Sequence, residues 1–110
     1  MLPKKERLDR AQFSRVFASG RRIHGVYTTV ILSPAPTFTS SVVVPKKVAK
    51  LAHERNRIRR RIYALLRKMR LDLDPKVALI VVTKPAISKL TRAEFVSQVA
   101  TEIGRALNKR

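Results

Sequence analysis

The pattern of apolar and polar residues predicts four strands along the chain. Residues 26–32 are rich in β-branched side chains and predict a strand. Residues 38–44 predict a second strand that runs antiparallel to the first, and a short extra strand is expected near residues 21–24. The apolar run at residues 76–83 predicts a central strand that is covered on both faces and parallel to a neighbour.

Two shorter helices are predicted near the ends of the chain. The first begins at Asp9, whose side chain can form a capping box with Gln12, and ends at Gly20. The last begins with a second capping box, formed by Thr91 and Glu94. The buried stripe of this last helix is expected to consist of Phe95, Val99, Ile103, Ala106 and Leu107.

The longest helix is predicted over residues 52–69. Its apolar face is formed by Ile58, Ile62, Leu65, Leu66 and Met69. The rest of the helix surface holds Arg and Lys side chains, with Asn56 and Tyr63 among them. The helix is therefore amphipathic, with one apolar face and one densely cationic face.

Together these elements predict a single α+β domain over residues 1–110, a sandwich of a central sheet and packed helices. The order is α-β-β-α-β-α, or α-β-β-β-α-β-α when the short strand is counted. The long helix would be a crossover helix if the strands on either side of it pair in parallel. The general rule favours a right-handed crossover.

Composition narrows the range of partners. The 110 residues hold 25 Lys and Arg against 7 Asp and Glu, with a pI of about 11.7, a balance typical of nucleic-acid binders. A membrane surface is the competing anionic partner, but no apolar segment approaches transmembrane length, so no membrane contact is expected. Because the chain shows no signal-peptide core and no cysteine, a cytoplasmic location is expected.

Positive charge is concentrated in residues 46–70, which hold eleven Lys and Arg against one acid, Glu54, a net charge of +10. Like charges three and four residues apart on a helix repel each other. Such a surface favours an anionic partner that relieves the repulsion, and a merely solvated basic face is the alternative. The excess of Arg favours phosphate, because a guanidinium can bond to it bidentately.

The sequence shows no catalytic constellation, metal-binding set or cofactor motif. His24 and His53 are lone histidines, more typical of solvated or RNA-contacting residues than of a base or a metal ligand. Asp72 and Asp74 are typical of a turn, with a metal site as the alternative. With only three glycines, the chain has no Gly-rich phosphate loop. Any catalysis associated with this protein is therefore expected to belong to something that it binds.

Phe13 and Phe17 lie four residues apart on the first helix. Core packing is one interpretation, and a stacking surface for unpaired bases is the other. Both interpretations hold if the edges of the two phenyl rings line a groove. Because the chain has few other aromatic residues, binding should be dominated by phosphate, with strong salt dependence and modest sequence preference.

The basic segment resembles the signature of the bacterial ribonuclease P protein component. That family has a Lys-Lys pair at the end of a strand, here Lys46-Lys47, then a short basic loop and an Arg-Asn-Arg motif on a helix, here Arg55-Asn56-Arg57 followed by Ile58-Arg59-Arg60. Two further motifs resemble the family: Phe13, Phe17 and Gly20 in the first helix, and Lys84-Pro85-Ala86 after the last strand.

The resemblance implies an α-β-β-β-α-β-α fold of the ribosomal protein S5 domain 2-like type, with a left-handed crossover through the Arg-rich helix. It implies the non-catalytic subunit of an endonuclease in which a large RNA holds the active site and requires Mg²⁺. The reaction is hydrolysis of precursor tRNA, leaving a mature 5′ end. The protein would bind no cofactor itself and would act as a monomer in a 1:1 complex with the RNA.

The resemblance and the neighbouring charges assign expected roles to particular residues. The cleft for the 5′ leader of the substrate is expected to be lined by Phe13, Phe17, Lys46 and Lys84. Contacts to the catalytic RNA are expected from Lys46, Lys47, Lys50, Arg55, Asn56, Arg57, Arg59, Arg60 and Arg61. The chain departs from the family pattern at Tyr63-Ala64, Thr83 and Ile31.

Two other functions compete with the ribonuclease P subunit. A general RNA-binding module, such as a ribosomal protein or an RNA chaperone, fits the charge equally well. A membrane-active or DNA-compacting basic protein would be amphipathic without a sheet, and the apolar strands predicted around residues 42–44 and 77–82 disfavour it.

Overall fold

The computed structural model describes residues 7–69 and 76–108. Within them, a four-stranded sheet has the strand order β1-β2-β4-β3. Its strands are β1 (Arg21–His24), β2 (Thr28–Pro34), β3 (Thr39–Val43) and β4 (Val77–Thr83). The helices are α1 (Arg10–Ser19), α2 (Ala52–Met69), the short 3₁₀ helix η2 (Pro85–Lys89) and α3 (Arg92–Asn108). This order confirms the predicted α-β-β-β-α-β-α architecture, including the short first strand.

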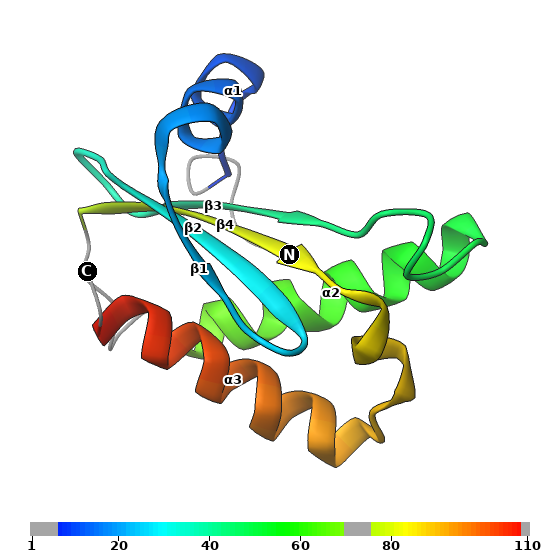
Figure 1. Ribbon diagram of the computed structural model, residues 1–110. Helices are drawn as coiled ribbons and strands as arrows, with labels where there is room; N and C mark the ends of the chain where they lie inside the picture. The colour runs from blue at the N-terminus through cyan, green and yellow to red at the C-terminus, as the bar shows by residue number, and fades with distance from the viewer. Residues whose placement is uncertain (1–6, 70–75, 109–110) are drawn as a thin grey trace.

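β4 lies inside the sheet, where it pairs in parallel with β3 and antiparallel with β2. This arrangement confirms the central, parallel-paired strand predicted from the apolar run. β3 runs opposite to β2, as predicted, but the two do not pair, because β4 lies between them. α2 connects the parallel strands β3 and β4 and is therefore a crossover helix (Figure 1). The left-handed sense of this crossover stays a prediction.

The boundaries of β2 differ from the sequence expectation at both ends. The strand begins at Thr28, because Val26 lies in the hairpin after β1, where its N–H donates to the carboxylate of Glu102 (2.7 Å) instead of to a strand. The strand then continues to Pro34, which lies opposite Val77. β2 is extended at this end because β4 is long enough to pair with it.

The helices form layers on opposite faces of the sheet. α1 lies on one face, and α2 and α3 lie together on the other (Figure 1). Side chains of β4 alternate between the two layers: Leu79 and Val81 enter the larger core against α2 and α3, whereas Ala78 and Ile80 enter a smaller core with Val16 of α1. All five are at most 3% exposed, which confirms that the strand is covered on both faces.

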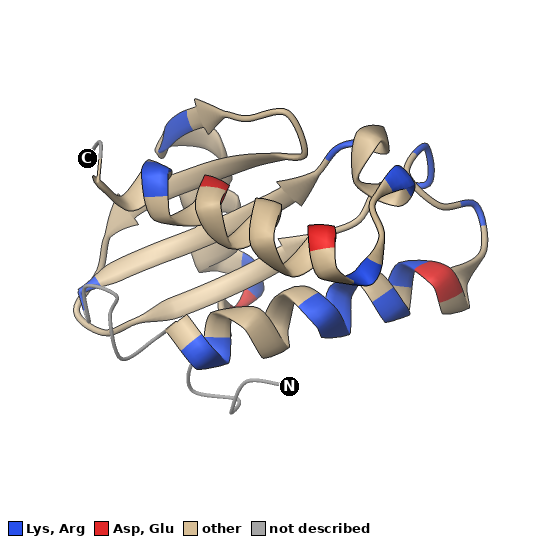
Figure 2. Ribbon diagram, turned by 90° about the horizontal axis from the view of Figure 1, so that it is seen from below, with Lys and Arg blue, Asp and Glu red and all other residues tan. Residues whose placement is uncertain are grey.

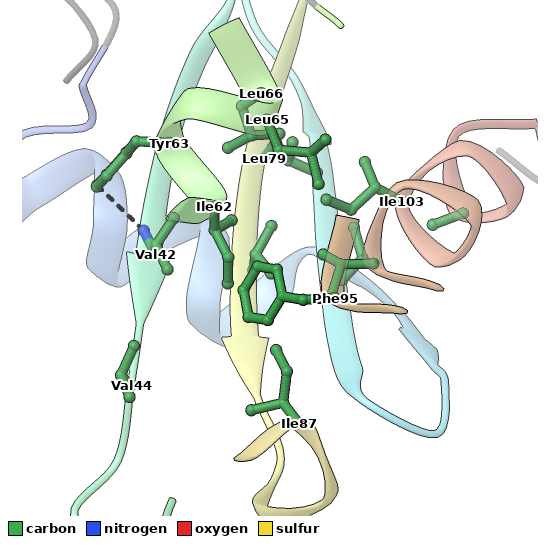
Figure 3. Packing of buried hydrophobic residues seen from close by; sticks show 14 of the residues in the cluster. Val42, Val44, Ile62, Tyr63, Leu65, Leu66, Leu79, Ile87, Phe95 and Ile103 are labelled. Carbon is green, nitrogen blue, oxygen red and sulfur yellow. Dashed lines mark hydrogen bonds between the residues drawn. The ribbon is translucent and has the colours of Figure 1, made fainter. Parts of the chain in front are cut away.

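The apolar faces predicted for the two long helices are confirmed in the larger core (Figure 3). From α2 it takes the buried side chains Ile62, Leu65 and Leu66, with Ile58 and Met69 partly buried against them. From α3 it takes Phe95, Val99, Ile103 and Ala106, with Leu107 partly buried.

Both predicted capping boxes are present. Gln12 N–H donates to Asp9 Oδ1 (2.8 Å), and Asp9 N–H donates to Gln12 Oε1 (3.3 Å). At the start of α3, Thr91 N–H donates to Glu94 Oε1 (2.9 Å) and Glu94 N–H donates to Thr91 Oγ1 (3.2 Å). The hydrogen bond that the Thr91 N–H donates to the Glu94 carboxylate, followed by hydrogen bonding of that carboxylate with the Thr91 side chain, lowers the pKa of Glu94 from its ordinary value. The first turns of α1 and α3 are thereby fixed.

α1 ends at Gly20, as predicted, and the structure leaves no space for a side chain at this position. Its φ of −69° is one that any residue adopts. A Cβ on Gly20 would lie 2.5 Å from the carbonyl oxygen of Val16 and 2.7 Å from Cγ2 of Ile31. The close approach of the end of α1 to β2 therefore requires glycine at this position.

Candidate nucleic-acid interface

The basic loop between β3 and α2 is anchored in the core by one buried residue, Val48. Val48 is 7% exposed and packs into the larger core, and its N–H donates to the carbonyl of Pro45 (3.0 Å). This turn leaves the side chains of Lys46, Lys47 and Lys50 exposed. Three ammonium groups therefore precede the N-terminus of α2, where the helix dipole adds to the positive potential.

Arg55 ties this loop to the first turns of α2. Its Nη1 donates to the carbonyl oxygens of Ala49 (3.0 Å) and Lys50 (2.6 Å), and the residue is half-buried. A guanidinium has five N–H donors, so donors remain for a phosphate. The structure thus shows an anchoring role that the sequence did not predict, and the predicted RNA contact of Arg55 stays a prediction.

The other residues predicted to contact RNA on α2 differ in exposure. Arg59 is half-buried and donates from Nη1 to Asn56 Oδ1 (2.5 Å). Arg61 is also half-buried, and its guanidinium carbon lies 5.8 Å from the centroid of the Phe95 ring. The exposed members of the set on this helix are Asn56, Arg57 and Arg60. Lys and Arg dominate α2 and the loop before it (Figure 2), so this side of the molecule is strongly cationic.

Tyr63 does not belong to the cationic surface on which the sequence analysis placed it. It is 6% exposed, and its hydroxyl oxygen accepts a hydrogen bond from the N–H of Val42 in β3 (3.1 Å; Figure 3). Position 63 lies at the boundary between the two faces of the helix, and the phenol ring is long enough to reach the outer edge of the sheet. Tyr63 is therefore a core residue that satisfies a backbone donor of an edge strand.

The two aromatic residues predicted for the leader cleft stack on each other on α1, with ring centroids 5.6 Å apart. Phe13 is half-buried against the smaller core, whereas Phe17 is 40% exposed. The guanidinium carbon of Arg22 lies 4.6 Å from the centroid of the Phe17 ring, a cation–π geometry, and Arg22 also donates to the Phe17 carbonyl. Phe13 therefore packs in the core, whereas Phe17 presents an exposed ring, and the stacking of that ring on an unpaired base stays a prediction.

The sequence analysis did not single out Arg22. The signal that could have found it is the alternation along β1, which puts Arg22 and His24 on one face. They lie opposite Ile31 and Thr29 of β2, and Ile31 belongs to the core under α1. Arg22 is therefore on the same face of the sheet as the aromatic pair.

Lys46 and Lys84 follow the carboxyl ends of β3 and β4. Because these strands are parallel, both lysines lie at the same end of the sheet. Lys46 is exposed, whereas Lys84 is half-buried, with its Nζ donating to the carbonyl of Gly25 (2.6 Å). Lys84 thus anchors the β1–β2 hairpin and keeps two further N–H donors on the same ammonium group.

One row of the sheet connects the aromatic pair with Lys84. This row consists of Val43, Val82, Thr29 and His24, which lie opposite one another on the four strands. On the same face of the sheet, it is the neighbour of the row that contains Arg22. Val43 and Val82 are half-buried, and His24 is exposed, with its Nδ1 3.1 Å from Thr29 Oγ1. This partly exposed strip is flanked by an aromatic ring and a guanidinium on one side and an ammonium group on the other.

Of the positions that depart from the family pattern, Ala64 is exposed and the other three point into the protein. Besides Tyr63, Thr83 is 1% exposed and donates from Oγ1 to the carbonyl of Val43 (3.2 Å). Ile31 is fully buried under α1. All three side chains therefore help to hold the sheet and its helices together.

The predicted acidic turn with Asp72 and Asp74 lies outside the described residues. Over residues 7–69 and 76–108, no group of three or more His, Cys, Asp or Glu side chains could hold a metal ion. Within the same ranges, no helix has both the length and the apolar character needed to span a bilayer.

A basic loop and helix on one side of an α+β sandwich, with an exposed Phe–Arg pair on another, define a small basic protein of the nucleic-acid-binding class. Comparison with known proteins specifies the family. The family model described as Ribonuclease P matches residues 2–107. The chain is 32% identical over 110 residues to the ribonuclease P protein component of Pseudanabaena sp., an alignment that covers 96% of this chain and 95% of that protein. The chain therefore belongs to the ribonuclease P protein family, a family of tRNA processing.

Solved structures show the same fold. The RNase P protein from Thermotoga maritima superposes with a TM-score of 0.80 at 19% identity, covering 96% of this chain and 97% of that one. A Staphylococcus aureus RNase P protein mutant with defective mRNA degradation activity gives a TM-score of 0.85 at 20% identity, covering 94% and 89%. This likeness confirms the predicted fold class.

Proposed function

We propose that this chain binds the catalytic RNA of ribonuclease P and the 5′ leader of precursor tRNA, and so promotes 5′ maturation. The observation that supports this most strongly is the basic loop at residues 46–50, which Arg55 fixes against the start of α2 in a chain of this family. In this proposal, one protein binds one RNA in the cytoplasm. The RNA provides the active site and its Mg²⁺ ions.

The catalytic RNA binds to the loop and the exposed side of α2. Exposed ammonium and guanidinium groups neutralise phosphates, and each neutralised phosphate releases counterions, so affinity falls steeply with salt. Because Arg55 and Val48 already order the loop, less conformational entropy is lost when its lysines meet phosphate. The positive end of α2 favours the same anions.

The 5′ leader binds on the α1 face of the sheet. The exposed ring of Phe17 stacks on an unpaired base, and Arg22 and Lys84 provide cations on either side of the strip of half-buried sheet residues. Aromatic faces and cations accept any base. The leader is therefore held with little sequence preference.

Reconstitution tests the proposal as a whole. The purified protein is mixed with a bacterial ribonuclease P RNA at low Mg²⁺, and precursor tRNA with a 5′ leader is supplied. Accurate cleavage that requires both components supports the proposal. Tight RNA binding without rescue of cleavage would contradict it and favour a general RNA-binding module.

The two phenylalanines provide a matched pair for the leader contact. Phe17→Ala should reduce the preference for precursor over mature tRNA while lowering the unfolding free energy by only about 1 kcal/mol, because the ring is 40% exposed and loses mainly its contacts with Phe13 and Arg22. Phe13→Ala should instead destabilise the fold, by about 2 kcal/mol, since its half-buried ring packs against the smaller core. Unchanged precursor preference in Phe17→Ala would refute the stacking contact.

Arg57 tests the contact with the catalytic RNA. Arg57→Ala should weaken binding and lower the slope of log K against log salt by about one unit, because one phosphate contact is lost. Arg105→Ala removes the same charge from an exposed position on α3 and should leave that slope nearly unchanged. Equal slopes in the two variants would count against a phosphate contact at Arg57.

A further inference from the structure

A groove between α2 and α3 is lined by Arg61, which is already expected to contact RNA, and by Lys68 and Arg92, to which no role has been assigned. Two hollows that are lined by described residues lie in it. One, of about 150 Å³, opens between the basic loop, η2 and α2, and the other, of about 250 Å³, opens between the middle of α2 and the first turns of α3. Because Arg61 and Phe95 line both, the hollows adjoin along the groove.

The larger hollow combines an apolar floor with a cationic rim. Leu65 and Phe95 are buried at its base, and Val96 is 51% exposed, an unusual degree of exposure for an apolar residue beside a core. The floor is formed by Ala64, Leu65, Phe95 and Val96, and the rim by Arg61, Lys68 and Arg92.

The charge around this hollow is positive. No acidic side chain is among the described residues that line it, and Glu54 lines only the smaller hollow. Glu94 lies in the first turn of α3, but its carboxylate is engaged by the N–H of Thr91. The three cations of the rim therefore have no acidic partner among the side chains lining the hollow.

We propose that this α2–α3 groove binds an unpaired segment of RNA, with one base on the apolar floor and its flanking phosphates on Arg61, Lys68 and Arg92. This inference rests on the proposed function for the identity of the partner. The volume of about 250 Å³ lies below the roughly 300–1,000 Å³ typical of drug-sized ligands, as suits a single planar base with its sugar and phosphate outside.

Two observations favour RNA over an acidic protein segment. Arg61 lies one helical turn after Arg57, so the groove continues the cationic surface proposed to bind the catalytic RNA. The rim also includes two guanidinium groups, whose planar donors match phosphate oxygens bidentately and stack on bases. α2 and α3, whose residues line the groove, lie on the face of the sheet opposite α1 (Figure 1), so the groove is separate from the proposed leader site.

The absence of cysteine in the sequence allows a direct test. Single cysteines are introduced as Ala64→Cys in the hollow, Lys47→Cys in the basic loop and Gln98→Cys on the outer side of α3, all at exposed positions. Each is labelled with an iron chelate that generates hydroxyl radicals and bound to ribonuclease P RNA. We expect Ala64→Cys to cut unpaired nucleotides other than those cut from Lys47→Cys, and Gln98→Cys to cut weakly.

The outcomes separate this inference from the proposed function. Cuts from Lys47→Cys but none from Ala64→Cys would overturn the groove site and leave the proposed function standing. Cuts from Ala64→Cys confined to paired helices would also overturn it. No cuts from either position would contradict both.

A charge-matched pair of double variants gives a second measurement. Lys68→Gln with Arg92→Gln should weaken RNA binding about tenfold and lower the salt slope by about one to two units. Arg21→Gln with Arg105→Gln removes the same charge from exposed sites away from the groove and should have a much smaller effect. Equal effects would overturn the site, as would a groove variant that loses binding of a poly-glutamate peptide but keeps its affinity for RNA.

Discussion

Removal of one oxygen atom tests the assignment of Tyr63 to the core. In Tyr63→Phe, the N–H of Val42 loses its partner at the edge of β3, where both residues are at most 6% exposed. A buried donor left without a partner costs about 1–3 kcal/mol. Because the phenyl ring keeps its packing, we expect a loss near the lower end, about 1–2 kcal/mol of unfolding free energy. For a domain of this size, that lowers Tm by about 5–10 °C.

Urea unfolding and thermal unfolding at constant ionic strength measure the effect. Tyr27→Phe is the matched control, because Tyr27 is half-buried and its hydroxyl has no hydrogen-bond partner among the described residues. It should change stability by less than about 0.5 kcal/mol. The reasoning is refuted if Tyr63→Phe is as stable as the parent. It is equally refuted if this variant loses RNA affinity without losing stability, because the hydroxyl would then be a surface contact.

Three further predictions concern other contacts. Glu102 accepts hydrogen bonds from backbone N–H groups of the β1–β2 hairpin and from Thr28 Oγ1 (2.7 Å), so Glu102→Ala should cost about 1–3 kcal/mol in urea unfolding, because it leaves several partly buried donors without a partner. Gly20→Ala should cost about 1–3 kcal/mol in thermal unfolding through its clash, whereas Gly104→Ala, with open space around it, should be neutral or stabilising. Because the pKa of Glu94 is lowered in the folded state, its charge contributes stability that is present above pH 4.5 and is lost as the pH falls through the folded-state pKa. The difference in urea midpoint between the parent and Glu94→Gln should therefore become smaller in acid.

Local signals in the sequence were sufficient for much of the fold. The two capping boxes depend on residues three positions apart, so Asp9 and Thr91 could be identified without knowledge of tertiary structure. The apolar run of β4 required cover on both faces, which fixed its central position. Strand neighbours are different, because pairing depends on residues far apart in the chain. The direction of β3 relative to β2 was predicted, but the insertion of β4 between them was not.

The candidate site was predictable in its charges but not in the direction of each side chain. Helical spacing placed Tyr63 among the cations, because a residue at the boundary of two faces can turn either way, and its hydroxyl found a donor on the sheet. Arg55 and Lys84 were expected to contact nucleic acid, yet each also bonds backbone carbonyls of its own chain. Arg22 was not predicted, because its role depends on a contact with the Phe17 ring that only the tertiary structure brings about.

Both outer strands of the sheet resist the addition of a foreign strand. At the β3 edge, Leu8 N–H donates to the carbonyl of Ser40 (3.1 Å), and the hydroxyl of Tyr63 occupies a further backbone group. At the other edge, β1 is only four residues long and bears Arg21 and Arg22, which repel a second copy of the same charge. Copies of this chain therefore meet either occupied hydrogen-bonding groups or like charge. Both edges of the folded sheet are thereby poor templates for cross-β polymerisation.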